Sequence, residues 1–135
     1  MAFFEWSDEF SVNIKEIDEE HKQLVKMLND LYEAMKAGQG SEMVGRILTG
    51  MAEYAKTHFA TEERYMKRYA YPGYAAHKAE HDEFAAKAAD LLERYAQNSK
   101  VLSIETGSFL KNWLRDHITG TDKLYGPYLN EKGVF

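Results

Sequence analysis

Apolar side chains recur along most of the chain at steps of three and four residues, which places them on one face of an α-helix. Leu24, Leu28, Leu31 and Met35 form one such stripe, and three further stripes follow it. Paired glycines, a Tyr-Pro-Gly segment and a polar stretch near position 100 separate the stripes. The pattern predicts an irregular arm over 1–17 and helices over roughly 18–37, 42–69, 74–97 and 103–125.

Asp18 is the expected N-cap of the first helix, because an aspartate oxygen can accept a hydrogen bond from the free N–H groups of the first turn. Four helices of about 20 residues joined by short connections favour an antiparallel, up-down-up-down four-helix bundle. The chain has no linker, internal repeat or low-complexity segment. The sequence therefore predicts an all-α fold with residues 1–135 in a single domain.

The composition narrows the possible partners and ligands. A net charge of −5 argues against a nucleic-acid partner, which requires a basic face. No apolar run approaches the roughly 20 residues needed to cross a bilayer, and the acidic N-terminus does not resemble a secretory signal. Cysteine is absent, which fits a cytoplasmic location and leaves imidazole and carboxylate as the available strong metal ligands. We therefore expect no membrane insertion.

All five histidines fall on the apolar faces of the four expected helices, at positions His21, His58, His77, His81 and His117. A single inward histidine is usually a core residue with one hydrogen bond, but buried imidazoles each need a polar partner and these stripes offer mainly apolar ones. In an antiparallel bundle the five positions also converge toward one end. The sequence thus predicts one histidine cluster in the interior.

Acidic residues near these histidines extend the candidate site. Glu62 lies one turn after His58 on the same face, whereas Glu63 points about 100° away and is expected in solvent. Asp122 follows His117 by five residues, which leaves the two about 140° apart in a regular helix. The spacing alone favours a surface position for Asp122, unless a π-bulge, a feature often found at functional sites, turns it inward.

Residues 77–81, HKAEH, match the H-x-x-E-H pattern of one class of zinc peptidases. In such an enzyme Glu80 must face the metal as general base, but it lies about 100° from His81 around the helix. A closed bundle of this size also offers no substrate cleft. The zinc peptidase interpretation is therefore disfavoured.

The strings IDEEH, HFATE, HKAEH and WLRDHITGTDKLYGP, in this order, resemble the ligand pattern of the hemerythrins, most closely the single-domain bacteriohemerythrins. The resemblance extends from the arm around Trp6 over nearly the whole chain. It implies a non-haem di-iron centre with an oxo or hydroxo bridge, and makes Asp122 a ligand. The implied ligands of one iron are His77, His81 and His117, those of the other are His21 and His58, and Glu62 and Asp122 bridge the two.

The resemblance also implies that dioxygen binds end-on at an open position of the iron with two histidines. Independently of the family, five imidazoles and two carboxylates suit iron better than magnesium or calcium. Ferritin-like di-iron enzymes use four carboxylates and two histidines, an anionic set that favours cleavage of the O–O bond. By resemblance the oxygen pocket is lined by Phe59, Trp113, Leu114 and Ile118. Tyr125, three residues after Asp122, is a candidate to hydrogen-bond a bridging carboxylate.

The predicted function is reversible dioxygen binding, without catalysis, for oxygen carriage, storage or delivery to an oxygen-consuming enzyme. Two alternatives remain open: a di-iron oxidase or iron-handling protein, and a sensor of oxygen or nitric oxide that acts through a separate partner. An oxidase would bleach rapidly in air, whereas a carrier would give a long-lived coloured form.

Overall fold

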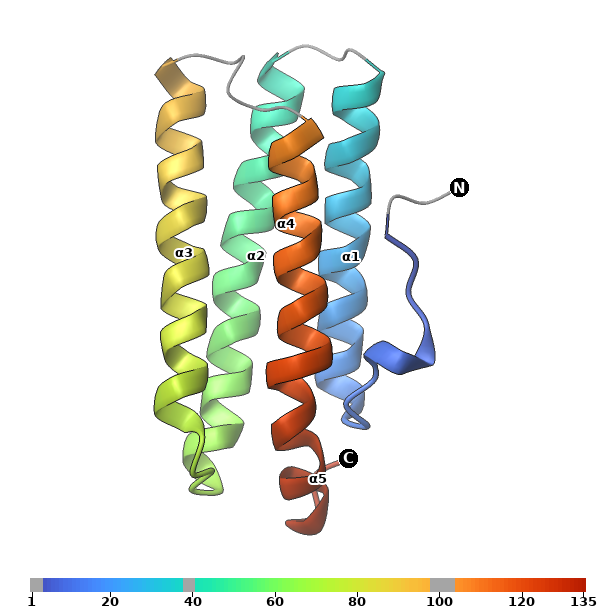
Figure 1. The fold of residues 1–135 in the computed structure, drawn as a ribbon, viewed down its shortest axis with the longest axis vertical. Helices are drawn as coiled ribbons and strands as arrows, with labels where there is room; N and C mark the ends of the chain where they lie inside the picture. Colours follow the sequence, from blue (N-terminus) through green and yellow to red (C-terminus); the bar gives the residue numbers. More distant parts are fainter. Residues whose placement is uncertain (1–3, 38–40, 98–103) are drawn as a thin grey trace.

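Four long helices lie side by side and alternate in direction, as Figure 1 shows for this computed structural model. The structure describes residues 4–37, 41–97 and 104–135. The elements are a short 3-10 helix (Asp8–Phe10), α1 (Lys15–Lys36), α2 (Ser41–Arg68), α3 (Tyr74–Gln97), α4 (Ile104–Asp116), a π-helical segment (His117–Asp122) and α5 (Lys123–Glu131). The expected all-α four-helix bundle is confirmed. None of the described helices combines the length and the apolar character needed to cross a membrane.

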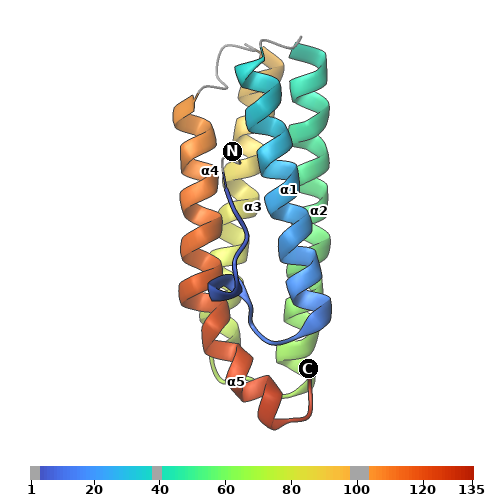
Figure 2. The ribbon, with the colours of Figure 1, turned by 90° about the vertical axis from the view of Figure 1, so that its right-hand side faces the viewer.

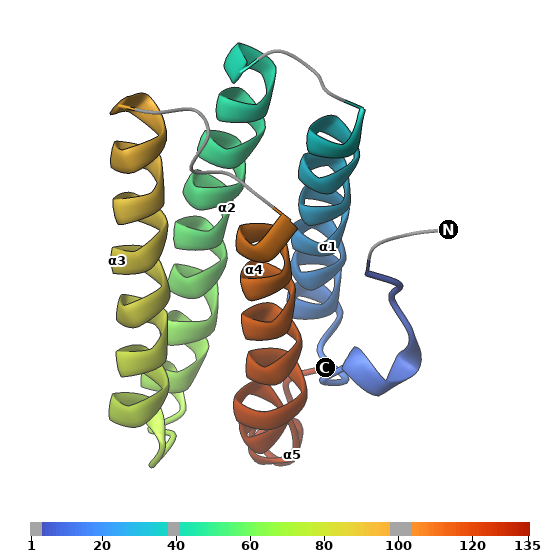
Figure 3. The ribbon, with the colours of Figure 1, turned by 45° about the horizontal axis from the view of Figure 1, so that its top comes forward.

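The helices surround one interior. α1 packs against both α2 and α4, and α2 packs against α3; the view in Figure 3, with the top of the bundle forward, shows the four axes around a common centre. The buried apolar side chains form two clusters. The upper cluster includes Leu24, Leu28, Ala55, Phe59, Phe84, Leu114 and Ile118. The lower cluster consists of Val12, Ile14, Ile17, Met66, Tyr125, Leu129 and Val134.

The beginning of the first helix differs from the expectation. α1 starts at Lys15, so Asp18 lies inside the helix and the prediction that it is the N-cap is wrong. Its carboxylate instead accepts hydrogen bonds from the Ser11 hydroxyl at 2.6 Å and from the Val12 N–H at 2.8 Å. Asp18 therefore fixes the arm to the bundle. Its carboxylate accepts from the Val12 N–H of the arm and not, as expected for an N-cap, from an N–H group of the first turn of the helix.

The N-terminal arm is part of the folded core. It runs between α1 and α4 in the view of Figure 2 and carries the buried side chains of Phe4 and Phe10 into the upper cluster. The Phe4 backbone donates to the Asn29 amide oxygen at 2.8 Å and accepts from its amide nitrogen at 2.9 Å. This two-bond clamp and the contacts of Asp18 hold the arm at both ends.

The expected fourth helix over 103–125 is composite; position 103 itself lies outside the described residues. α4 ends at Asp116, and the chain continues through the π-helical segment into α5, which slants across the lower end of the bundle (Figure 2). Gly126 on α5 meets the arm so closely that an added Cβ would lie 3.0 Å from the Val12 carbonyl oxygen. A larger residue at position 126 would fit only if the Val12 backbone shifted by a few tenths of an ångström.

Replacing Asp18 with alanine should release the arm. The free energy of unfolding is expected to fall by about 2 kcal/mol, because two partly buried donors lose a charged acceptor. Urea titration followed by circular dichroism would measure this, with Asp30→Ala as a control in which only an exposed ion pair to Lys26 is lost. Equal unfolding free energies for the two variants would show that Asp18 does not anchor the arm.

Candidate metal centre

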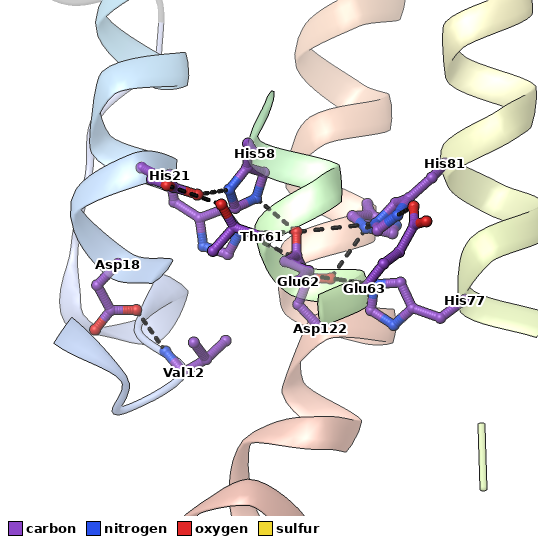
Figure 4. A network of polar contacts seen from close by, with 12 residues as sticks. Val12, Asp18, His21, His58, Thr61, Glu62, Glu63, His77, His81 and Asp122 are labelled. Carbon is purple, nitrogen blue, oxygen red and sulfur yellow. Dashed lines mark hydrogen bonds and ion pairs between the residues drawn. The ribbon is translucent and has the colours of Figure 1, made fainter. Parts of the chain in front are cut away.

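A layer of polar side chains crosses the interior between the two apolar clusters. α1 supplies His21, α2 supplies His58 and Glu62, α3 supplies His77 and His81, and the π-helical segment supplies His117 and Asp122, as Figure 4 shows for six of the seven by label. Each of these side chains is buried, with at most 3% of its surface exposed. The structure thus brings together all seven residues that the sequence indicated as ligands.

The seven residues fall into two groups whose potential ligand atoms lie within 4.8 Å of one another. One group contains His77, His81 and His117, the other contains His21 and His58, and both contain Glu62 and Asp122. Two groups that share two carboxylates are the arrangement needed to hold a pair of cations. This division has the same membership as the one that the resemblance implied.

The π-helical segment explains how Asp122 reaches the layer. A π-helix bonds residue i to residue i+5, so the fifth residue after His117 returns toward the same side of the helix. Asp122 is accordingly fully buried, and the expectation of a surface position, drawn from regular helical spacing, is wrong. The alternative of a local π-bulge describes the structure.

Three glutamates outside this set bond to the outer Nδ1 atoms of three of the histidines. The pairs are Glu20 with His58 at 2.7 Å, Glu63 with His81 at 2.9 Å and Glu80 with His117 at 3.0 Å. The expectation that Glu63 is solvated is wrong, since its side chain is only 20% exposed. Each glutamate is the sequence neighbour of an inward residue and points toward the following helix. The periodicity of a single helix does not reveal such a contact between helices.

These pairs fix the protonation of the three imidazoles. An ionised carboxylate can only accept, so each Nδ1 carries a hydrogen, and in the neutral ring each Nε2 then presents a lone pair to the interior. The Nε2 atoms of His81 and His117 face each other at 3.1 Å, a distance at which one of them can donate a hydrogen to the other if its ring is doubly protonated. If both rings are neutral, two lone pairs meet there, and a metal ion bound by both nitrogens would remove their repulsion.

The carboxylates lead to the same conclusion. Asp122 oxygens lie 3.0 Å from Nε2 of His21, 2.8 Å from Nε2 of His77 and 3.0 Å from Nε2 of His117. Neither oxygen makes a hydrogen bond to any described residue, and the same holds for both Glu62 oxygens. Ligands about 2.1 Å from one ion and at right angles lie about 3 Å apart, so these separations suit shared coordination.

The electrostatics keep both carboxylates charged. Burial opposes ionisation of Glu62, but the neighbouring imidazoles, His58 foremost, hold its pKa well below the usual value. The pKa of Asp122 is also lowered, although burial and the charge of Glu62 act against this. In the opposite sense, contacts with these carboxylates overcome burial and raise the pKa values of His21 and His77 to about 9. Two buried anions therefore attract protons or metal ions to the layer.

Aromatic and aliphatic side chains enclose the layer. Phe59 stacks on His81 with ring centroids 4.0 Å apart, and Trp113 stacks on His117 at 4.6 Å. Leu114 and Ile118 are buried in the upper cluster just above the layer. The four expected pocket residues thus lie on its upper side, where they exclude water.

Tyr125 closes the layer from below and stacks on His77 at 5.3 Å. Burial and the nearby charge of Glu62 raise its pKa well above 10, so the phenol stays protonated. Its buried hydroxyl makes no hydrogen bond of good geometry to the described residues, and the expected bond to a carboxylate remains a prediction.

Removing the carboxylate from Glu63 should weaken metal binding. Without its partner, His81 loses the hydrogen bond that sets its tautomer and orientation, and we expect about a 10- to 100-fold lower metal affinity for Glu63→Ala. Competition with a chelator would measure the change, and Glu83→Ala, which alters an exposed glutamate two residues after His81, is the control. Unchanged affinity in Glu63→Ala would contradict the role of this pair.

Comparisons with known proteins agree over nearly the full length. Residues 12–129 match the family model of the hemerythrin HHE cation binding domain. Bacteriohemerythrin from Methylococcus capsulatus is 37% identical over 96% of this chain and 99% of that protein. Myohemerythrin from Theromyzon tessulatum is 30% identical over 90% of each. A crystal structure of wild-type hemerythrin superposes with a TM-score of 0.88 at 35% identity, covering 95% of this chain and 98% of the other. This chain belongs to the hemerythrin family.

Proposed function

We propose that this protein binds dioxygen reversibly at a non-haem di-iron centre. One iron would be held by His77, His81 and His117 and the other by His21 and His58, with Glu62 and Asp122 shared between them. The observation that carries the proposal is the division of the buried layer into two ligand groups with two carboxylates in common. The membership of the chain in the hemerythrin family supports the choice of iron and of dioxygen.

The ligand types favour binding over turnover. Two ferrous ions can together lend two electrons to dioxygen and recover them on release. Five neutral imidazoles donate less negative charge than the carboxylates of ferritin-like enzymes, so they favour the reduced metal and disfavour O–O cleavage. This argument supports a carrier, a store or a supplier of an oxygen-consuming enzyme over an oxidase.

The residues around the layer have two tasks in this function. The glutamates paired with Nδ1 atoms hold three imidazoles in the orientation that directs their Nε2 lone pairs inward. The buried side chains of Phe59, Leu114 and Ile118 keep water from the interior. A dry site slows the proton-assisted release of oxygen in reduced form, which would leave the irons oxidised and which a reversible carrier must avoid.

We predict two iron ions per chain in protein produced with ample iron, because one ion cannot use five imidazoles and two carboxylates. Asp122→Ala should load iron poorly, since both ligand groups contain Asp122. Iron analysis by mass spectrometry, referred to protein concentration, would measure both values. Asp82→Ala removes a nearby carboxylate that is 65% exposed and serves as the control.

Either of two results would contradict the di-iron assignment. The first is a parent protein with one iron per chain, or one that retains zinc under iron excess. The second is an Asp122→Ala variant that holds as much iron as the parent.

Replacing Leu114 with alanine should admit water to the site without changing any of the proposed metal ligands. We expect Leu114→Ala to bind two irons and to form in air the coloured form expected of a carrier, which should disappear again under argon. Irreversible oxidation should remove this reversible change in absorbance faster in the variant than in the parent. The cavity should also lower the free energy of unfolding by about 2–5 kcal/mol. Repeated cycles of air and argon, followed optically well below the melting temperature, would measure the loss.

Leu31→Ala is a matched control, because Leu31 is equally buried in the upper cluster but lies about 15 Å along α1 from His21. It should lose stability without faster oxidation. Equal oxidation rates in the parent and Leu114→Ala would show that Leu114 does not protect the site. A parent that bleaches in air, with no reversible absorbance, would favour the oxidase or sensor function.

A further inference from the structure

Glu80, the acidic residue of HKAEH, is not among the seven proposed ligands, yet its carboxylate bonds to two residues of the π-helical segment. Its Oε1 accepts from Nδ1 of His117 at 3.0 Å. The Thr121 hydroxyl donates to the same carboxylate, at 2.8 and 2.9 Å from its two oxygens. One side chain of α3 thus holds two positions of the π-helical segment, four residues apart.

The four-residue spacing between His117 and Thr121 bears on the direction in which the Asp122 side chain points. In an α-helix a turn takes 3.6 residues, so Thr121 and Asp122 both lie past one full turn and on the same side of His117. In a π-helix a turn takes more than four residues and fewer than five, so Thr121 falls just short of a full turn and Asp122 just beyond it. The two side chains then lie on opposite sides of His117.

The structure has this second arrangement. Thr121 lies on the side of His117 that faces Glu80, and Asp122 is buried in the layer with its oxygens 2.8–3.0 Å from three Nε2 atoms. A carboxylate that holds Thr121 to one side of His117 therefore also turns Asp122 to the other.

The sequence of the π-helical segment does not strongly favour the α-helical register, so the bonds to Glu80 can influence it. HITGTD contains a glycine and three β-branched residues, all weaker helix formers than alanine or leucine. An added Cβ at Gly120 would meet no atom within 4 Å, so the glycine is not required for space. With little intrinsic preference for the α-helical register, a tertiary contact can select the π-helical one.

We propose that Glu80 is a positioning residue that fixes the π-helical register by bonding His117 and Thr121 together, and thereby directs Asp122 into the metal centre. The effect of Glu80 on metal binding rests on the proposed function, in which Asp122 is a ligand. The effect of Glu80 on the backbone register rests on the hydrogen bonds alone. The two effects can therefore be tested separately.

Thr121→Val is the sharpest variant, because it keeps the shape of the side chain and the Glu80–His117 bond while removing the hydroxyl donor. Thr121→Ser restores the hydroxyl. Thr119→Val is the matched control, since it makes the same change two residues away, where the hydroxyl donates to the Arg115 carbonyl of its own helix at 2.8 Å.

Two measurements are needed. Anaerobic titration with ferrous iron should show at least about a tenfold loss of affinity in Thr121→Val, with near-parental binding in Thr121→Ser and Thr119→Val. Amide hydrogen exchange on each protein as purified should be faster over 117–122 in Thr121→Val alone. A variant that is merely destabilised would instead exchange faster throughout the bundle.

Parental iron affinity in Thr121→Val, or unchanged exchange over 117–122, would overturn the proposal. Failure of Thr121→Ser to restore both properties would also overturn it. A parent protein that binds no iron would contradict the proposed function instead, and the exchange measurement would still decide whether Thr121 holds the π-helical register.

Discussion

The fold is organised around a buried layer of two carboxylates and five imidazoles, most of whose inward polar atoms lack hydrogen-bond partners among the described residues. Both carboxylates of the layer lack hydrogen-bond donors among the described residues, and Nε2 atoms of His81 and His117 face each other at 3.1 Å. Burying such groups without partners costs free energy, which protonation of His21 and His77 or a bound cation would offset. The proposed metal binding would therefore also stabilise the bundle, whose two apolar clusters this layer separates.

The outer glutamates connect this layer to the order of the helices. An acid of each of the first three helices bonds to a histidine of the next helix in the chain: Glu20 to His58, Glu63 to His81 and Glu80 to His117. The proposed metal ligation and the packing of the helices therefore use the same contacts. A shift of one helix along its neighbour would break an outer hydrogen bond as well as an inner ligand position.

The lower end of the bundle is closed by segments from both ends of the described chain. The arm is bonded to α1 through Asp18, and α5 passes close to the arm at Gly126. Between them, Tyr125 covers the layer from below, while the upper cluster covers it from above. This double cover keeps the dielectric constant low, which strengthens each electrostatic contact within the layer.

Much of the fold and the site follows from the sequence alone, because the apolar period of a helix and the inward placement of five histidines are both local patterns. The same local reasoning gave the wrong positions for Asp18 and Glu63, since their partners lie on other segments. Asp122 shows the limit most clearly. Regular spacing turns it to solvent, and only a π-helical turn, bonded to Glu80 of a neighbouring helix, brings it inside. The regular period of a helix is encoded in its own sequence, whereas the contacts that accompany the departure from this period before Asp122 come from another helix.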